Sequence, residues 1–145
     1  MLTAELINNN IPRLQLQDSV GKAIRLINDY RVTHLPVVNE EIYLGMISED
    51  DLLDAYDEKS GIEILQEHFV HDSVKDDVHF LNAVNYTSLH ETSIVPVINK
   101  TNALTGVITA PDLLKAMAAF SGSNEFGGII VLEMERSQFA ISEIS

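Results

Sequence analysis

The sequence contains no cysteine and no tryptophan. The absence of cysteine excludes disulfides, thiolate zinc sites and cysteine nucleophiles, and it is compatible with a reducing compartment. Basic residues are also few, with 9 Lys and Arg against 22 Asp and Glu and a formal net charge of −13. Because so acidic a chain is poorly suited to nucleic acid or to anionic lipid, we expect neither as a partner.

Targeting and catalytic signals are missing as well. No run of about 18 apolar residues could span a bilayer, and the first ten residues, MLTAELINNN, lack the basic start and apolar stretch of a signal peptide. The sequence has no phosphate loop, no nucleophile elbow, no persuasive pair of catalytic carboxylates and no histidines at metal-ligand spacing. We therefore expect a cytoplasmic protein that is not an enzyme and holds no metal.

What the chain does contain is an internal repeat within its 145 residues. Pro36 and Pro96 lie 60 positions apart, and Gly45 and Gly106 lie 61 apart, each in the same local context. One residue has therefore been inserted between Asn99 and Gly106. Since a repeat of this period defines a structural unit, we read the chain as two copies of one motif.

Both copies predict the same order of strand, helix, strand, strand and helix. In the first copy, Asp18 or Ser19 is a candidate N-cap for a helix with apolar residues at helical spacing, and two apolar segments flank a polar turn as in a hairpin. The inserted residue falls in the turn of the second hairpin. The predicted segments of the first copy are a helix that follows the Asp18 or Ser19 cap and ends near Arg31, strand 34–38, turn 39–43, strand 44–48 and a helix from 48. Those of the second copy are helix 78–91, strand 94–98, turn 99–103, strand 104–109 and helix 110–120.

Short helical lead segments precede the two copies at residues 3–9 and 61–69, and residues 57–61 form a polar connector. A unit of about sixty residues buries little of its surface alone. We therefore expect an α+β fold in which two β-α-β-β-α repeats pack sheet to sheet, with each lead segment embracing the opposite repeat.

Each copy has an apolar strand with the pattern x-x-L/V-P-V-V/I, followed by G-h-h-[ST]-x-x-D-L-L, where h is apolar. Over residues 1–120 this order resembles a tandem pair of CBS domains, the Bateman module. The resemblance implies CBS domain 1 at residues 1–58, CBS domain 2 at 59–120, and a pseudo-twofold disc with two clefts. In that family the clefts often hold adenosine compounds, here AMP, ADP, ATP or S-adenosylmethionine, which regulate an attached protein.

The same resemblance marks eight candidate ligand-binding residues. A hydroxyl and a carboxylate in each repeat match the positions that meet phosphate and ribose, and two residues before each strand proline match those that frame the base. The first set is Ser48, Asp51, Thr109 and Asp112, and the second is Thr33, His34, Ser93 and Ile94.

A purely structural role accounts for part of this pattern. A Ser or Thr followed three residues later by an acid is a helix capping box, so Ser48 with Asp51 and Thr109 with Asp112 need no ligand. Free N–H groups at a helix start also attract phosphate, and a carboxylate accepts hydrogen bonds from ribose hydroxyls. The two roles are compatible, and both stay open.

The two clefts are not expected to be equal. Glu49 and Asp50 stand beside the first site and oppose a phosphate, whereas Ala110 and Pro111 are neutral, and proline is acceptable in a first helical turn. We therefore favour the second cleft for a nucleotide. Because basic residues are scarce, AMP is easier to accommodate than ATP. The loose candidates for holding phosphate are Arg13, Arg31 and Lys100.

Residues 121–145 differ in composition from the repeats. A Gly- and Ser-rich link is followed by an apolar strand and the start of a helix. This order is similar to the beginning of an ACT-like domain, and a strand that adds to a dimer is the other interpretation.

The sequence as a whole predicts a regulatory module, expected to be a homodimer that binds an adenosine-type ligand. Two other functions stay open: a ligand-free dimerisation module, and the regulatory fragment of a longer enzyme.

Overall fold

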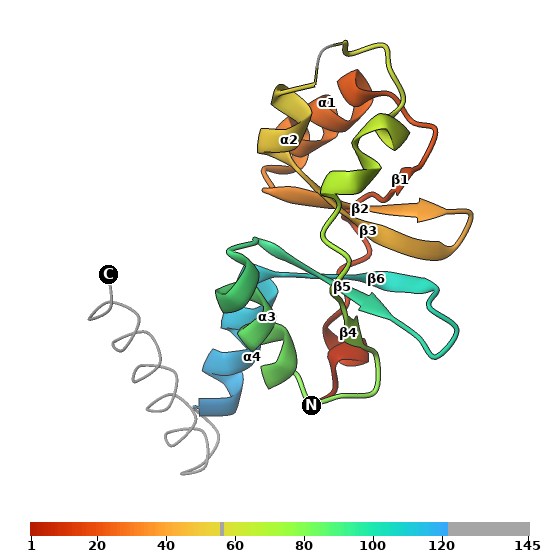
Figure 1. The fold of residues 1–145 in the computed structure, drawn as a ribbon. Coiled ribbons are helices and arrows are strands. Elements are labelled where there is room, and N and C mark those ends of the chain that lie inside the picture. Colours follow the sequence, from red (N-terminus) through yellow and green to blue (C-terminus); the bar gives the residue numbers. More distant parts are fainter. Residues whose placement is uncertain (56, 122–145) are drawn as a thin grey trace. The chain divides into compact units, whose positions relative to one another are not determined.

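The computed structural model describes residues 1–55 and 57–121. The chain forms two compact units, with the boundary after Ala110. Residues 1–110 contain two three-stranded mixed sheets, which Figure 1 shows stacked with helices on their outer sides. The predicted link, strand and helix of residues 122–145 lie outside the described part. The α+β fold of two β-α-β-β-α repeats is confirmed.

The first repeat has strand order β1-β2-β3, with β1 parallel to β2 and β2 antiparallel to β3. The second repeat has the same arrangement in β4-β5-β6. The first repeat consists of β1 (Leu14–Gln15), α1 (Val20–Tyr30), β2 (His34–Asn39), β3 (Ile42–Ser48) and α2 (Glu49–Leu53). The second consists of β4 (Val74–Lys75), α3 (Leu81–His90), β5 (Ile94–Ile98), β6 (Leu104–Thr109) and α4 (Ala110–Ser121).

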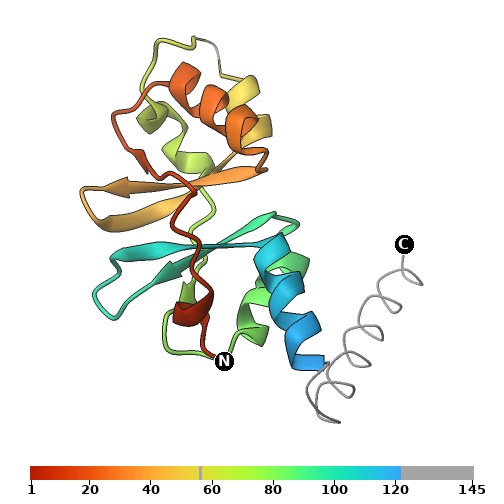
Figure 2. The ribbon, with the colours of Figure 1, turned by 180° about the vertical axis from the view of Figure 1, so that it is seen from behind.

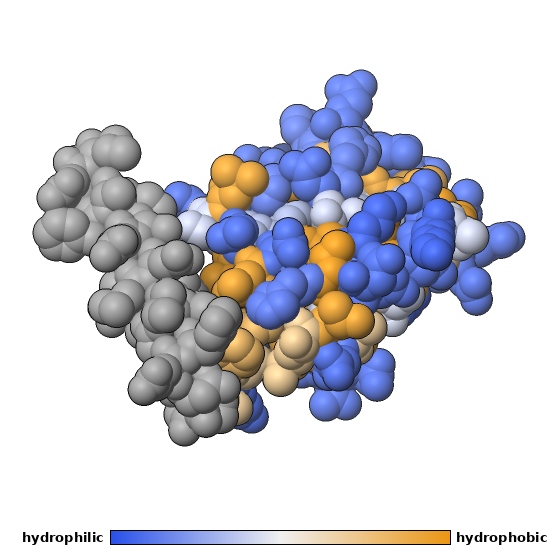
Figure 3. Space-filling view, turned by 90° about the horizontal axis from the view of Figure 1, so that it is seen from below, coloured by the Kyte–Doolittle hydropathy of each residue, from blue (hydrophilic) through white to orange (hydrophobic). Residues whose placement is uncertain are grey.

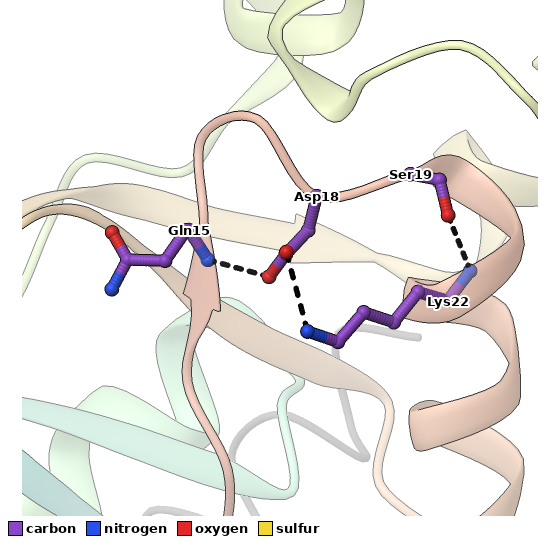
Figure 4. Close-up of polar contacts among 4 residues, drawn as sticks. All are labelled: Gln15, Asp18, Ser19 and Lys22. Carbon is purple, nitrogen blue, oxygen red and sulfur yellow. Dashed lines mark hydrogen bonds and ion pairs between the residues drawn. The ribbon is translucent and has the colours of Figure 1, made fainter.

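Helix α1 begins where the sequence predicts. The Ser19 hydroxyl accepts a hydrogen bond from the Lys22 backbone N–H at 3.1 Å, which caps the first turn. Figure 4 shows that Asp18 supports this start, because its carboxylate accepts from the Gln15 N–H at 2.8 Å and from the Lys22 ammonium at 3.2 Å. Arg31 in the left-handed conformation ends the helix.

The hairpin turns differ in length, as the inserted residue predicts. The turn predicted over residues 39–43 is too long, because β3 already begins at Ile42 and only Glu40 and Glu41 connect the strands. In the second hairpin, the Asn99 side chain accepts hydrogen bonds from the N–H groups of Thr101 and Ala103. That side chain stabilises the longer turn.

The lead segments form 3₁₀ helices, η1 (Thr3–Leu6) and η2 (Ile62–His68), and each crosses to the opposite repeat. The Asn8 N–H donates to the Val107 carbonyl of β6, and Val70 exchanges two backbone hydrogen bonds with Met46 of β3. Figure 2 shows the N-terminal segment running down beside the second sheet. The predicted embrace is confirmed, although the segments are 3₁₀ rather than α-helical.

These crossings explain two glycines. Gly45 and Gly106 have φ angles of +144° and +156°, which side-chain-bearing residues rarely adopt. A Cβ on Gly45 would lie 2.7 Å from the Phe69 Cβ, and one on Gly106 would meet the Ile7 side chain. Glycine therefore lets each lead segment lie directly on the opposite strand.

The sheets themselves are joined at the hairpin tips. The Tyr43 N–H donates to the Asn102 carbonyl and the Leu104 N–H to the Glu41 carbonyl, both at 2.9 Å. Val38, Ile98 and Leu104 form an apolar cluster beneath these bonds, with Tyr43 packed against it. The two repeats therefore share one core, as the small size of each one requires.

Some apolar side chains stay on the surface. Met1, Leu2 and Leu89 are exposed to 46%, 45% and 77%. Figure 3, which views the molecule from the second-repeat end, shows apolar and polar surface interspersed on this face. Single exposed apolar residues of this kind are ordinary in folded proteins, so they do not mark an interface by themselves.

Candidate functional site

Each hairpin places two of the predicted site residues side by side at its open end. His34, the first residue of β2, is the antiparallel partner of Ser48, the last residue of β3. In the second repeat, Ile94 and Thr109 are partners in the same way. The structure thus brings the predicted base-framing position of each repeat next to the predicted phosphate-binding hydroxyl.

The helix that follows each hairpin starts directly at this hydroxyl. The Ser48 Oγ accepts a hydrogen bond from the Asp51 backbone N–H at 3.1 Å, so the predicted Ser48 cap is confirmed. Three acids, Glu49, Asp50 and Asp51, occupy the first turn of α2. This first site is therefore strongly acidic.

Helix α4 begins differently. This helix runs from Ala110 to Ser121, and Asp112 is the acid of its first turn. Pro111 stands at the second helical position, where its missing N–H removes no intrahelical bond. The charge difference between the two helix starts that the sequence predicts is present in the structure.

Thr33 and Ser93, which precede the two proline-containing strands, lie against each other. The Thr33 N–H donates to the Ser93 Oγ at 2.9 Å, and the Ser93 N–H donates to the Thr33 Oγ1 at 3.0 Å. The two hydroxyl oxygens are 3.2 Å apart. The sequence marks both positions as base-framing, but it does not reveal that the two residues, one from each repeat, contact each other.

The backbone of this pair also holds both helix starts. The Thr33 carbonyl accepts from the Glu49 N–H at 3.0 Å, and the Ser93 carbonyl accepts from the Ala110 N–H at 2.9 Å. Each helix therefore begins with an N–H group that is already bonded to the residue before the neighbouring strand.

His34 is half-buried, and its Nδ1 lies 2.8 Å from the Thr33 Oγ1. Burial lowers the pKa of His34 below its ordinary value of 6.5, while Asp51 and Asp50 oppose the shift and His90 adds to it. The imidazole is therefore neutral at pH 7 and supplies no positive charge for a phosphate. Ile94, at the matching position, is fully buried.

A cluster of polar residues that the repeat pattern does not predict lies mainly on the second repeat, with Tyr43 contributed by the first. The Asp72 carboxylate is 3.2 Å from the His90 Nε2, and the hydroxyls of Tyr86 and Tyr43 donate to the Asp72 carbonyl at 2.8 and 3.1 Å. Burial, and then the charge of Asp72, raises the pKa of Tyr86 above its ordinary value, so the phenol remains a donor.

Asp72, Tyr86 and His90 of this Asp72 cluster line a cavity of about 430 Å³ between β4 and α3. These three residues have Pro12, Leu26 and Tyr30 as their counterparts sixty residues earlier. A search for shared residues cannot find such a cluster. The signal that could have found it is the set of polar residues by which the second repeat departs from the first.

Two further findings, on metal clusters and on membrane-spanning helices, concern the described ranges 1–55 and 57–121. Within them no group of three or more His, Asp or Glu side chains could hold a metal ion. No helix in that part of the chain is both long and apolar enough to cross a membrane.

The comparisons with known proteins agree with the fold. A family model described as CBS domain matches residues 4–58. A CBS-domain pair/ACT-domain protein from Thermotoga maritima has the same fold, with a TM-score of 0.74 and 20% identity, over 82% of this chain and 98% of that one. The chain folds as a tandem pair of CBS domains.

Two solved CBS structures carry ligands. CBSX2, in complex with AMP, matches with a TM-score of 0.62 and 21% identity, over 81% of this chain and 96% of its own. The CBS-domain pair of the protein MJ0100, in complex with 5′-methylthioadenosine and S-adenosyl-L-methionine, matches with a TM-score of 0.62 and 20% identity, over 82% and 97%. At such identities these structures establish the fold that the chain shares with them.

Among curated proteins, the inosine-5′-monophosphate dehydrogenase of Methanocaldococcus jannaschii is 27% identical over 113 residues. The match covers 77% of this chain but 22% of the dehydrogenase. The chain therefore spans about a fifth of the length of that enzyme.

Proposed function

We propose that this CBS pair is a non-catalytic regulatory module that binds an adenosine-type ligand in the clefts between its repeats. The observation that carries the proposal is the convergence of His34 with Ser48, and of Ile94 with Thr109, at the open end of each hairpin, directly before a helix start. AMP in CBSX2 and S-adenosyl-L-methionine in MJ0100, two proteins of this fold, support an adenosine ligand here. The proposed repeats are residues 1–58 and 59–120.

Within that class, the charges favour AMP over ATP. The formal net charge is −13, and a triphosphate needs several cations near it. Of the candidate cations, Arg13 donates to the Leu104 carbonyl at 2.9 Å and Arg31 forms the C-cap of α1. The hydrogen bond holds the Arg13 guanidinium at the second hairpin, so that cation is less available to a phosphate chain.

The local charge also favours Thr109 and Asp112 over Ser48 and Asp51 as the neighbours of the nucleotide. The first turn of α2 holds three acids, and that of α4 holds Asp112. Since a negative phosphate is repelled by carboxylates, the second helix start is the better neighbour for it. The acidic first cleft suits a ligand with less negative charge.

Signalling would follow from selection between arrangements of the repeats or of two copies of the chain. A ligand that binds one arrangement more tightly shifts the population toward it. Leu53 and Leu114 occupy matching positions in α2 and α4 and are exposed to 59% and 64%. We include a homodimer in the proposal; the exposed leucines are compatible with it, although they do not mark an interface by themselves.

A second candidate is a dimerisation module with empty clefts. The hydrogen bonds between Thr33 and Ser93 favour it, because they satisfy both residues without any ligand. A regulatory segment of a longer enzyme is also compatible with the match to one fifth of a dehydrogenase.

Isothermal titration of the purified chain with AMP, ATP and S-adenosylmethionine distinguishes these functions. We expect saturable binding of AMP and at least about tenfold weaker binding of ATP, a difference of about 1.4 kcal/mol. The chain must first be shown to be free of nucleotide carried over from expression. If none of the three compounds produces heat of binding, and equilibrium dialysis also detects no binding, the proposal is contradicted. That result would support the empty dimerisation module.

A further inference from the structure

The exchange of hydrogen bonds between Thr33 and Ser93, here called the clasp, joins the two repeats at the open ends of their hairpins. Each residue donates its backbone N–H to the other's hydroxyl oxygen, so neither bond can be kept if one residue moves away. The Thr92 hydroxyl lies 3.4 Å from the Thr33 hydroxyl and extends the contact.

The Thr33 hydroxyl has little capacity left for a further partner. Its oxygen accepts from the Ser93 N–H, and it lies within 3.2 Å of the Ser93 Oγ and 2.8 Å of the His34 Nδ1. A hydroxyl offers one donor and two acceptor positions. The side chain of Thr33 is therefore engaged in joining the repeats.

The carbonyl groups of the same two residues extend the connection to both helix starts. The Glu49 N–H at the start of α2 is bonded to Thr33, and the Ala110 N–H at the start of α4 is bonded to Ser93. A continuous series of hydrogen bonds thus runs from Glu49 through Thr33 and Ser93 to Ala110.

The opposite end of the sheets is joined in another way. At the hairpin tips the bonds run from the Tyr43 N–H to Asn102 and from the Leu104 N–H to Glu41, and they involve backbone groups alone. The clasp depends on two side-chain hydroxyls. The clasp is therefore the connection between the repeats that a single side-chain substitution can remove, and it lies next to the predicted sites.

We propose that Thr33 and Ser93 are positioning residues that couple the two predicted ligand sites, so that a change at one helix start alters the other. The coupling rests on the proposed function for what binds there, but the clasp itself exists without ligand. Binding at one site would then change the affinity of the other site, and the effect would be reciprocal.

The test is amide hydrogen exchange of the full chain without ligand, followed by NMR at Glu49 and Ala110. Thr33→Val removes a hydroxyl from the first repeat, and we expect exchange at Ala110 in the second repeat to accelerate by about fivefold or more. Ser93→Ala should accelerate exchange at Glu49 in the same way. Thr33→Ser keeps the hydroxyl and should restore the wild-type rate at Ala110.

Thr105→Val is the matched control, because the Thr105 hydroxyl donates to the Val97 carbonyl within the second repeat. It should leave both Glu49 and Ala110 unchanged. If either clasp variant alters exchange only in its own repeat, or in neither, the proposal is wrong. If Thr33→Val does not fold, Ser93→Ala with the Glu49 readout decides the question alone.

Titration of the wild-type chain with AMP, beside the exchange data on the variants, separates this proposal from the proposed function. A chain that binds no AMP but shows the cross-repeat change in exchange has the clasp and lacks the ligand. A chain that binds AMP with unchanged exchange in the clasp variants has the ligand and lacks the coupling.

Discussion

The two repeats share a backbone and differ in the chemistry of their open ends. Both have a left-handed residue after the first helix, Arg31 in one and Glu91 in the other, and both have a glycine under the crossing lead segment. Where they differ is at His34 against Ile94, and at three acids against one in the following helix turn. The shared features fix the fold, and the differences assign unequal roles to the two clefts.

The largest difference in stability is expected at the paired glycines. Gly45→Ala forces a Cβ against Phe69 and to 3.1 Å from the Val70 carbonyl, in a backbone conformation that alanine rarely adopts. Together, strain and crowding should lower the free energy of unfolding by about 3 kcal/mol or more.

Gly106→Ala provides the comparison, because its neighbour is the side chain of Ile7 near the N-terminus. That side chain can turn aside more easily than a backbone carbonyl, so we expect a loss of about 1–3 kcal/mol. Urea unfolding of both variants measures the two values. A larger loss for Gly106→Ala than for Gly45→Ala would show that the lead segments are not held as described.

A smaller effect is expected from pH at His34. Its pKa is lowered in the folded chain, chiefly by burial, so the unfolded chain binds the proton more readily. Stability is therefore full above pH 6.5 and falls as the pH drops from there toward the folded-state pKa, by less than about 1.4 kcal/mol per pH unit.

His34→Ile, which gives the first repeat the residue of the second, isolates this contribution. The other histidines are common to both proteins, so the difference between their slopes reports on His34. Urea unfolding at pH 7.5, 6.5 and 5.5 should give a shallower loss in the variant. Parallel curves for the two proteins would exclude a lowered pKa.

The sequence predicts the repeats because an offset of 60 residues for the prolines, and of 61 for the glycines and the helix caps after the inserted residue, places these features in register. Ser19 and Ser48 cap the helices that the sequence predicts. A serine hydroxyl directly before an apolar periodic segment accepts a hydrogen bond from a backbone N–H of the first helical turn. The turn predicted over residues 39–43 is too long. Ile42 and Tyr43 directly follow the polar residues of the turn in the sequence, but they pair with β2 in the structure.

The parts of the candidate site that the sequence does not predict are contacts between segments that are distant in the sequence. Thr33 and Ser93 are sixty residues apart, and nothing local shows that each satisfies the other's N–H. The Asp72 cluster depends on the path of the second lead segment, which is set by its pairing with Met46. Such contacts follow from tertiary packing, which a repeat pattern does not specify.

The measurement that tests the central claim most directly is thermal unfolding with and without saturating AMP, for the wild type, Asp112→Asn and Asp51→Asn. Ligand at a hundred times its dissociation constant adds about 2.7 kcal/mol, a rise of several degrees for a chain of this size. We predict that the rise is lost in Asp112→Asn and kept in Asp51→Asn. A rise lost only in Asp51→Asn, or absent from the wild type, would contradict the assignment of the nucleotide to the second cleft.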